Sequence, residues 1–318
     1  MTGRMAARGR DADYPSEVPV LGWRDILLRV WEQTGTDNIS MIAAGVAFYG
    51  LLAIFPAITA LVSIWGLVAD PAQVQQQFAA IQDFVPAEAW QLLDDQLRAV
   101  AATSATSLGW GVAFGILVAL WSAGAGVRAL ITALNIAYDE EEKRGFMSFY
   151  AVACLFTIAL IGAAMLALIV IVAVPVVLQF LPLGGFSNAV IRILTWSFLA
   201  ALVIAGLALL YRYGPSRRHA RLRWVTWGAV AAAVLWLLAS FLFQVYAANF
   251  ANYGATYGSL GAVVALLMWF WISAFVGLLG AELNAEMEHQ TRRDSTTGPE
   301  KPLGARGAYV ADHVGEVP

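Results

Sequence analysis

The sequence has little charge and almost no cysteine or histidine. Only 13% of its 318 residues are charged, about half the share found in soluble domains, while 60% are hydrophobic. This composition excludes disordered and collagen-like chains and argues against a water-soluble enzyme. Its single cysteine, Cys154, has no partner for an intramolecular disulfide, so the chain is not a disulfide scaffold.

The sequence also lacks the usual marks of a catalytic or metal site. His219, His289 and His313 are far apart and no cysteine lies near them, which excludes the ligand spacing of a zinc site. The acidic run 139–142 would point its side chains to different faces of a helix, so it does not suit a divalent ion. We therefore expect no catalytic residue, no metal, no cofactor and no nucleic-acid partner.

The apolar residues instead form six long runs. A hydrocarbon core about 30 Å thick needs about 20 such residues in a helix. The runs cover residues 39–68, 108–128, 149–181, 189–211, 224–248 and 257–281. The third is too long for a straight span, so Pro175 breaks or kinks it, or its first turns lie outside the core. The predicted fold class is an all-α polytopic membrane protein with six transmembrane helices.

Lys and Arg are distributed unequally about these spans. When alternate loops are assigned to opposite sides, 17 of the 19 basic residues fall on one side, and only Arg98 and Arg192 on the other. Loops rich in Lys and Arg remain in the cytoplasm. Both termini are therefore predicted to be cytoplasmic.

Four segments flank or interrupt the six-helix domain, which covers residues 38–290. Residues 1–20 are predicted to form a disordered cytoplasmic arm, and residues 291–318 a disordered cytoplasmic tail. Residues 21–37 form an amphipathic helix that lies on the membrane surface or packs against the inner mouth of the bundle. Residues 70–107 form an external helical hairpin with five acidic residues and one basic residue. This hairpin caps helix ends, acts as a lid, or presents a surface to a partner.

A few polar residues near the inner ends of spans are candidate substrate or pathway residues. Arg128 lies two helical turns before Asn135. Its side chain either reaches the lipid headgroups or points inward and binds an anionic group. Glu282 and Glu286 are four residues apart and share a helix face, so we expect them to pair with Arg128 or with the basic loop after the fourth span.

Two further sets of residues extend the candidate site. Tyrosines at the junction of the last two spans are typical interfacial anchors, while the amides beside them indicate a hydrated vestibule or interhelical hydrogen bonds. The candidates at this junction are Gln244, Asn249, Asn252, Tyr253 and Tyr257. The basic loop supplies the candidate contacts to anionic lipid headgroups, which are Arg212, Arg217, Arg218, Arg221 and Arg223.

Several separated sequence blocks occur in the order seen in one family of membrane proteins. They are residues 43–49, Phe55-Pro56, residues 135–138 before an acidic run, Tyr257-Gly258 and residues 279–284. Over about residues 21–288 the chain resembles the YihY/BrkB family of bacterial inner-membrane proteins, once labelled ribonuclease BN-like. The resemblance implies a six-span protein of the inner membrane and transfers no catalytic residue.

Three functions remain open from the sequence. The leading hypothesis is a transporter or lipid-handling permease for an anionic solute or lipid, because of the proline-interrupted spans, the outer amides and Arg128. The alternative is a non-transporting scaffold that recruits partners through the external hairpin or the basic loop. A membrane enzyme such as a ribonuclease is disfavoured, because no acid–base or metal-ligand set lies outside the bilayer.

Overall fold

The computed structural model describes residues 7–65, 94, 98, 110–179, 187–249 and 261–318. Within them the regular structure is helical, and the one β-type pairing is an isolated bridge between Ala220 and Thr296. The long helices are α2 (Val20–Thr36), α3 (Ile39–Trp65), α6 (Trp110–Ala137), α7 (Phe146–Gln179), α8 (Ser187–Tyr213), α9 (Leu222–Asn249) and α11 (Gly261–Gln290). The short helices are η1 (Pro15–Glu17) and α12 (Tyr309–Asp312).

The helices have the length and composition of a multi-pass membrane protein. Five of them, α6, α7, α8, α9 and α11, are long and apolar enough to cross a bilayer. The pair α2 and α3 makes a sixth if it is counted as one span with a bend of 63°. The all-helical membrane fold expected from the sequence is therefore confirmed. The predicted hairpin 70–107, apart from two single residues, lies outside the described residues.

Two helices extend beyond the spans predicted from the sequence. The second span was ended at Arg128 and the sixth at residue 281, where charge returns, yet α6 continues to Ala137 and α11 to Gln290. The charges do not stop these helices because their side chains have partners, aromatic rings for Arg128 and buried ions for α11. α7 is not broken at Pro175, since the helix continues through that residue. A kink at Pro175, and first turns that lie outside the hydrocarbon core, stay predictions.

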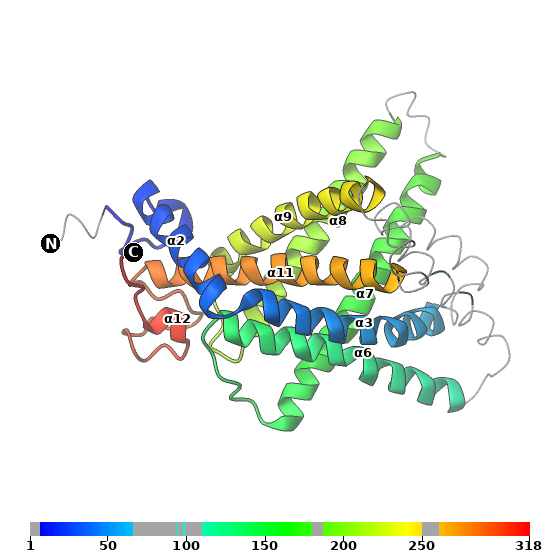
Figure 1. Ribbon diagram of the computed structural model, residues 1–318, viewed down its shortest axis with the longest axis horizontal. Coiled ribbons are helices and arrows are strands. Elements are labelled where there is room, and N and C mark those ends of the chain that lie inside the picture. Colours follow the sequence, from blue (N-terminus) through cyan, green and yellow to red (C-terminus); the bar gives the residue numbers. More distant parts are fainter. Residues whose placement is uncertain (1–6, 66–93, 95–97, 99–109, 180–186, 250–260) are drawn as a thin grey trace.

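The long helices form a bundle, which Figure 1 shows from the side, and a closed series of contacts runs through it. In this series, α3 contacts α6, α6 contacts α7, α7 contacts α8, α8 contacts α9, α9 contacts α11, and α11 returns to α3. In Figure 1, α3, α6 and α11 run side by side along the long axis, while α7 and α8 cross them obliquely. An oblique course suits α7, whose 34 residues would reach about 51 Å along the helix axis.

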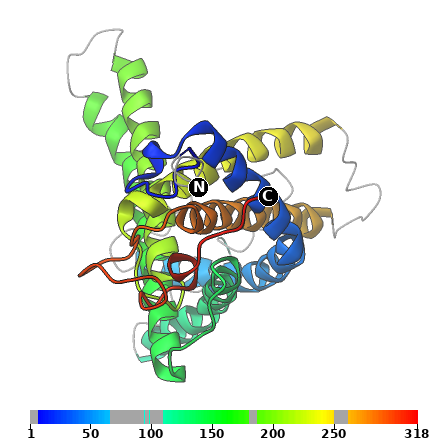
Figure 2. The same cartoon turned by 90° about the vertical axis from the view of Figure 1, so that its left-hand side faces the viewer.

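Both described chain ends lie at one end of this bundle, together with the loops after α6 and α8, and we call this region the terminal end (residues 7–36, 138–145, 214–221 and 282–318). Figure 2 shows this face with the two termini close together. Arg10 links them by donating to the carbonyl oxygen of Gly315 at 2.6 Å. The tail is packed, with Val310 buried and Arg306 donating to the carbonyls of Arg292 and Ala311. The predictions of a disordered arm and tail are therefore wrong for these residues, because buried arginines satisfy backbone that composition alone leaves without partners.

The bend between α2 and α3 is made by Asn38, whose φ of 53° lies in the left-handed region that asparagine tolerates. It sets α2 against α11, with Asp25, Ile26 and Arg29 buried. The opposite face of α2 exposes large apolar side chains, of which Trp31 is 83% exposed. α2 therefore packs against the bundle through a mixed face, on which Ile26 is buried beside Asp25 and Arg29, and it leaves apolar side chains such as Trp31 exposed.

Candidate functional site

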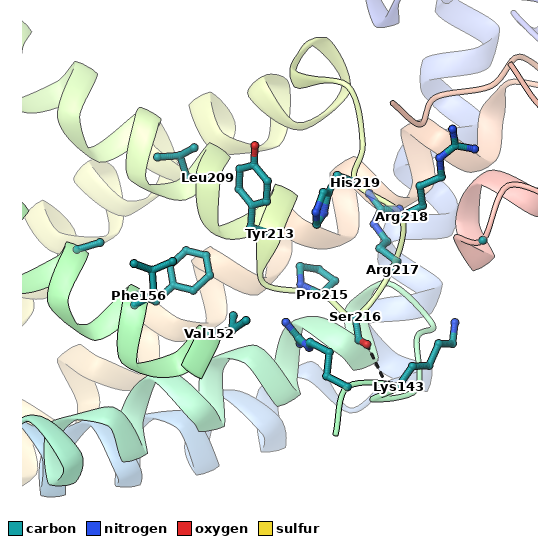
Figure 3. A pocket seen from close by; sticks show the side chains of 14 residues that line it. Lys143, Val152, Phe156, Leu209, Tyr213, Pro215, Ser216, Arg217, Arg218 and His219 are labelled. Carbon is teal, nitrogen blue, oxygen red and sulfur yellow. Dashed lines mark hydrogen bonds between the residues drawn. The ribbon is translucent and has the colours of Figure 1, made fainter. Parts of the chain in front are cut away.

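A pocket of about 650 Å³ lies between α7 and α8, where they approach the terminal end. Figure 3 shows its two unlike sides: Val152 and Phe156 of α7 and Leu209 of α8 form an apolar wall, and basic side chains form the opposite rim. The rim comes from three segments, the loop after α6, the loop after α8, and Gly307 of the tail. Its ionisable residues are Lys143, Arg144, Arg217, Arg218 and His219.

Three of the four permanent cations on the rim are neutralised by carboxylates. Lys143 pairs with Glu140 at 2.7 Å, and Arg144 pairs with Glu142 at 2.7 Å. Arg217 pairs with Glu288 of α11 at 2.6 Å, and both of these side chains are fully buried. These pairs hold the two loops around the pocket but contribute little net charge to it.

Arg218 is the cation left in excess. None of the described residues forms an ion pair with it, and its Nη2 only donates to the carbonyl of Pro299 at 3.3 Å. Its Nη1 is buried without a hydrogen-bond partner among the described residues, as are Nε and Nη1 of Arg217. These three nitrogens are covered by protein, so what the rim offers to a ligand is the uncompensated charge of Arg218, about one net positive charge.

Two titratable groups near the rim do not alter this balance at neutral pH. Burial lowers the pKa of His219, and the neighbouring Arg212 and Arg217 cations act in the same direction, which favours the neutral imidazole. Burial would raise the pKa of Glu142, but hydrogen bonds from Arg144 and Asn135 outweigh it and lower the pKa to about 2. Glu142 therefore remains an anion that holds the Arg144 guanidinium.

The five arginines proposed as lipid contacts do not act as one cluster. Only Arg217 and Arg218 line the pocket. The guanidinium of Arg212 lies over the Tyr213 ring, and that of Arg223 over the Tyr14 ring at 4.1 Å. Arg221 donates to the carbonyl of Thr296 in the tail. Arg221 and Arg223 thus hold segments of the terminal end together, while Arg212 contacts only its neighbour in the sequence through this ring.

The predicted partners of the α11 carboxylates need correction. Glu286 pairs with Arg29 of α2 at 2.5 Å. Glu288 forms the ion pair with Arg217 of the basic loop. Asn284 accepts from the Gly228 N–H and donates to the Val225 carbonyl, which fixes α9 to α11. Pairing with the basic loop is therefore made by Glu288, a residue that the sequence reasoning did not select.

Arg128 contacts neither Glu282 nor Glu286 through any described ion pair. Its guanidinium lies 5.4 Å from the centre of the Trp121 ring and 4.8 Å from that of Tyr150, whose rings stack on each other. Its Nη1 also reaches the Trp121 carbonyl at 3.5 Å. The side chain therefore extends back along α6, away from the terminal end and from the pocket rim.

Of the remaining candidates, the structure describes the side chains of Asn135 and Gln244 and not those of the other four. Asn135 is buried and accepts from the Ser216 N–H at 2.8 Å while donating to Glu142, so it connects both loops of the pocket. Gln244 is exposed on α9. Asn252, Tyr253 and Tyr257 lie outside the described residues, as does the side chain of Asn249.

Sequence reasoning missed Lys143, Arg144 and His219 as members of the site. The first two were counted in the charge asymmetry that set the orientation, but nothing in the sequence indicates that residues 143–144 and 215–219 meet. The contact from the Lys143 N–H to Ser216 Oγ at 3.0 Å joins them. Within the described part of the chain, no group of three His, Cys, Asp or Glu is arranged to hold a metal ion.

Comparison of the sequence with known proteins shows a family of relatives. The sequence model of a family described as Virulence factor BrkB matches residues 30–304. YfkH of Bacillus subtilis, whose name calls it ribonuclease-like, is 31% identical over 76% of this chain and 88% of its own length. A UPF0761 membrane protein of Vibrio parahaemolyticus is 28% identical over 80% of this chain and 79% of its own. No solved structure matches the chain.

Proposed function

The chain belongs to the BrkB family of multi-pass membrane proteins, and from this premise we propose that it is a lipid-handling permease that binds an anionic lipid in the α7–α8 pocket. The observation that carries the proposal is the pocket itself, with an apolar wall, a basic rim and one unpaired cation, Arg218. A phospholipid phosphodiester carries one negative charge, which matches that excess.

The position of the pocket supports a lipid more than a water-soluble anion. Leu155 lines the pocket and is 67% exposed on the outer surface of α7, where a bilayer would lie. Acyl chains could therefore remain against the apolar wall while the phosphate meets the rim. Basic pockets between helices on the cytoplasmic side are typical sites for anionic headgroups.

The orientation is part of the same proposal. The terminal end carries most of the Lys and Arg residues outside the spans, so we infer that it faces the cytoplasm of a bacterial inner membrane. The pocket then opens to the inner leaflet. Pro56 and Pro175 both lie inside continuous helices, α3 and α7, so neither proline marks a broken span that would support transport. The scaffold alternative depended partly on residues 70–107, which lie outside the described residues.

Arg218→Ala tests the binding step. Purified protein is titrated with phosphatidylglycerol and, separately, with phosphatidylcholine, and bound lipid is counted by native mass spectrometry. Loss of one hydrogen bond to a charged group, worth about 1.5–3 kcal/mol, should weaken phosphatidylglycerol binding roughly tenfold or more. Arg223→Ala is the matched control, since it removes the same charge from the first turn of α9, where the Arg223 guanidinium stacks on Tyr14 and does not line the pocket. Equal binding by the two variants would contradict the proposal.

Two further arms separate the possible ligands and the transport step. Glycerol 1-phosphate, which has the phosphate but no acyl chains, should compete poorly; strong competition would make the ligand a soluble anion. In proteoliposomes, labelled phosphatidylglycerol should move between leaflets faster with the wild type than with Arg218→Ala. Lipid binding without any such movement would reduce the function to lipid binding and overturn the permease.

A further inference from the structure

The outer face of α2 is apolar and is largely uncovered by the described residues. It consists of Val20, Leu21, Leu27, Leu28 and Trp31, which share one side of the helix at spacings of three, four and seven residues. Their exposed fractions run from 44% for Leu28 to 85% for Val20. Large apolar side chains gathered on one helix face mark a surface that a membrane or a protein covers.

The opposite side of α2 fixes this outer face in place. Arg29 pairs with Glu286 of α11 at 2.5 Å and donates to Gln290 Oε1 at 2.8 Å. Asp25 accepts from Arg8 at 2.5 Å. Both Asp25 and Arg29 are buried. Rotation of α2 to cover its outer face would leave buried charges without their partners, which is costly.

The outer face lies at the depth of the lipid headgroups. The 30 residues of α11 reach about 45 Å, the thickness of a hydrocarbon core of about 30 Å together with its headgroup regions. α2 packs against the last turns of α11, at Glu286 and Gln290, where the charged residues of that helix lie. α3 has 27 residues, about 40 Å, and is long enough to cross the core without α2.

The outer face is also continuous with the surface of two helices long enough to span a bilayer. At one end of α2, the Trp23 ring lies with its centre 5.7 Å from that of the exposed Trp227 on α9. At the other end, the chain turns through 63° into α3, where Met41 is exposed. A bilayer around α9 and α3 would therefore also border α2. Tryptophan is enriched at the boundary between hydrocarbon and water.

The exposed charges of α2 cancel. Arg24 and Glu32 are exposed, whereas Asp25 and Arg29 are neutralised by their ion pairs. The long Arg24 side chain can lie along the apolar face with its guanidinium among the headgroups. Apolar area rather than net charge is therefore what this face offers, in contrast to the pocket rim with its excess cation, Arg218.

We propose that the outer face of α2 binds the lipid surface at the terminal end, with Val20, Leu27 and Trp31 at the boundary between the headgroups and the hydrocarbon. α2 is then an interfacial helix and not half of a bent span. Both placements that the sequence left open apply, one to each side of the helix. The proposal does not rest on the lipid pocket, because that pocket lies between α7 and α8.

An environment-sensitive dye on the outer face tests the contact. The single cysteine is removed by Cys154→Ala, and nitrobenzoxadiazole is attached to the full-length protein through Leu28→Cys or, as the control, Leu303→Cys. Leu28 on α2 and Leu303 in the tail are each 44% exposed, so protein covers them equally. In phosphatidylcholine liposomes the dye at position 28 should emit at shorter wavelength and be quenched best by lipids spin-labelled near the headgroup. The dye at position 303 should emit as in water.

Three results of this experiment would overturn the proposal. Equal emission and quenching at the two positions would mean that the outer face has no special contact with lipid. Emission at short wavelength without quenching by lipid would place protein, such as a second copy of the chain, on the face. Quenching that is strongest with a spin label deep in the acyl chains would make α2 part of a span.

Lipid composition and a charged variant separate this surface from the pocket. Exchange of phosphatidylcholine for phosphatidylglycerol, added salt, or Arg218→Ala should leave the quenching at position 28 unchanged. Quenching that requires phosphatidylglycerol would contradict an apolar contact. Trp31→Asp should keep the wild-type melting temperature in detergent, because this side chain is 83% exposed. The same variant should lose the quenching in liposomes, and retained quenching would contradict the proposed surface.

Discussion

The terminal end and the helix pair α7 and α8, which we call the α7–α8 hairpin, place polar and apolar groups in opposite ways. At the terminal end Arg217 and Glu288 are fully buried and paired. Along the hairpin, Ile158 of α7 and Leu194 of α8 are more than half exposed. The first arrangement would suit a protein in water, and the second is stable only where hydrocarbon replaces water. One chain is thus adapted to two solvents, and the proposed lipid pocket lies where they meet.

Glycines are packed closely between α9 and α11, which lead to the terminal end, but not along α7 and α8. Gly228 of α9 lies directly against Gly280 and Asn284 of α11, with no room for a side chain. Gly162 of α7 and Gly206 of α8 have no neighbouring atom within 4 Å of where a Cβ would be. Small residues therefore allow close helix packing in one region and are exposed to the surroundings in the other.

Breaking the buried ion pair should have the largest effect on this contrast. Arg217→Ala leaves the Glu288 carboxylate buried without its cation, which should destabilise the protein by about 3–5 kcal/mol. Thermal unfolding in detergent measures the loss. The double variant Arg217→Met with Glu288→Met should recover most of it, because apolar side chains replace both charges. A stable Arg217→Ala protein would mean that the terminal end is hydrated rather than buried.

Gly228→Ala should have the next largest effect. The new methyl group would clash with the Gly280 carbonyl and the Asn284 side chain, at a cost of about 1–3 kcal/mol. Gly206→Ala is the matched control on the hairpin, where it should be neutral or slightly stabilising. Melting temperatures of the two variants, measured together, check the difference. Equal losses would contradict close packing as the distinguishing feature.

Glu142→Gln should have a smaller effect that depends on pH. The Glu142 pKa is lowered to about 2, mainly because hydrogen bonds from Arg144 outweigh the effect of burial. Its contribution to stability is therefore present above the ordinary carboxyl pKa of about 4.3 and is lost as pH falls toward 2. The variant should melt below the wild type at neutral pH, and the two curves should converge in acid. A constant difference at all pH values would contradict the charge-based account.

Ile158→Ala should have the smallest effect. This side chain is 51% exposed on the outer surface of α7, so its removal leaves no cavity in the protein. The change in stability should stay within about 0.5 kcal/mol. The same truncation at Leu134, which is fully buried in the core, should cost about 2–5 kcal/mol. Comparable losses at the two positions would place the hairpin inside a larger assembly.

The sequence predicted the apolar helices well and the terminal end poorly, for one physical reason. A span must cross a fixed thickness of hydrocarbon, so its length can be read from a local run of residues. Arg29 and Glu286, by contrast, are 257 positions apart, and no local pattern reveals that they meet. The same distance effect hid the pocket, since Lys143 and Arg218 belong to separate loops. Periodicity predicted an amphipathic helix at α2, but not that Asp25 and Arg29 would be buried on the same side as Ile26.

The contact between Arg10 and Gly315 joins residues 305 positions apart and has a consequence for biosynthesis. A bacterial chain enters the membrane from its amino end as it leaves the ribosome. Among the described residues, the side-chain acceptors of Arg10 and Arg29 lie on residues 286–316, so these contacts of the first segment can form only after the last segment has been made. The earliest segment to be translated is thus among the last to complete its contacts. Removing the tail should deprive Arg10 and Arg29 of the carbonyl acceptors at Gly315 and Glu316.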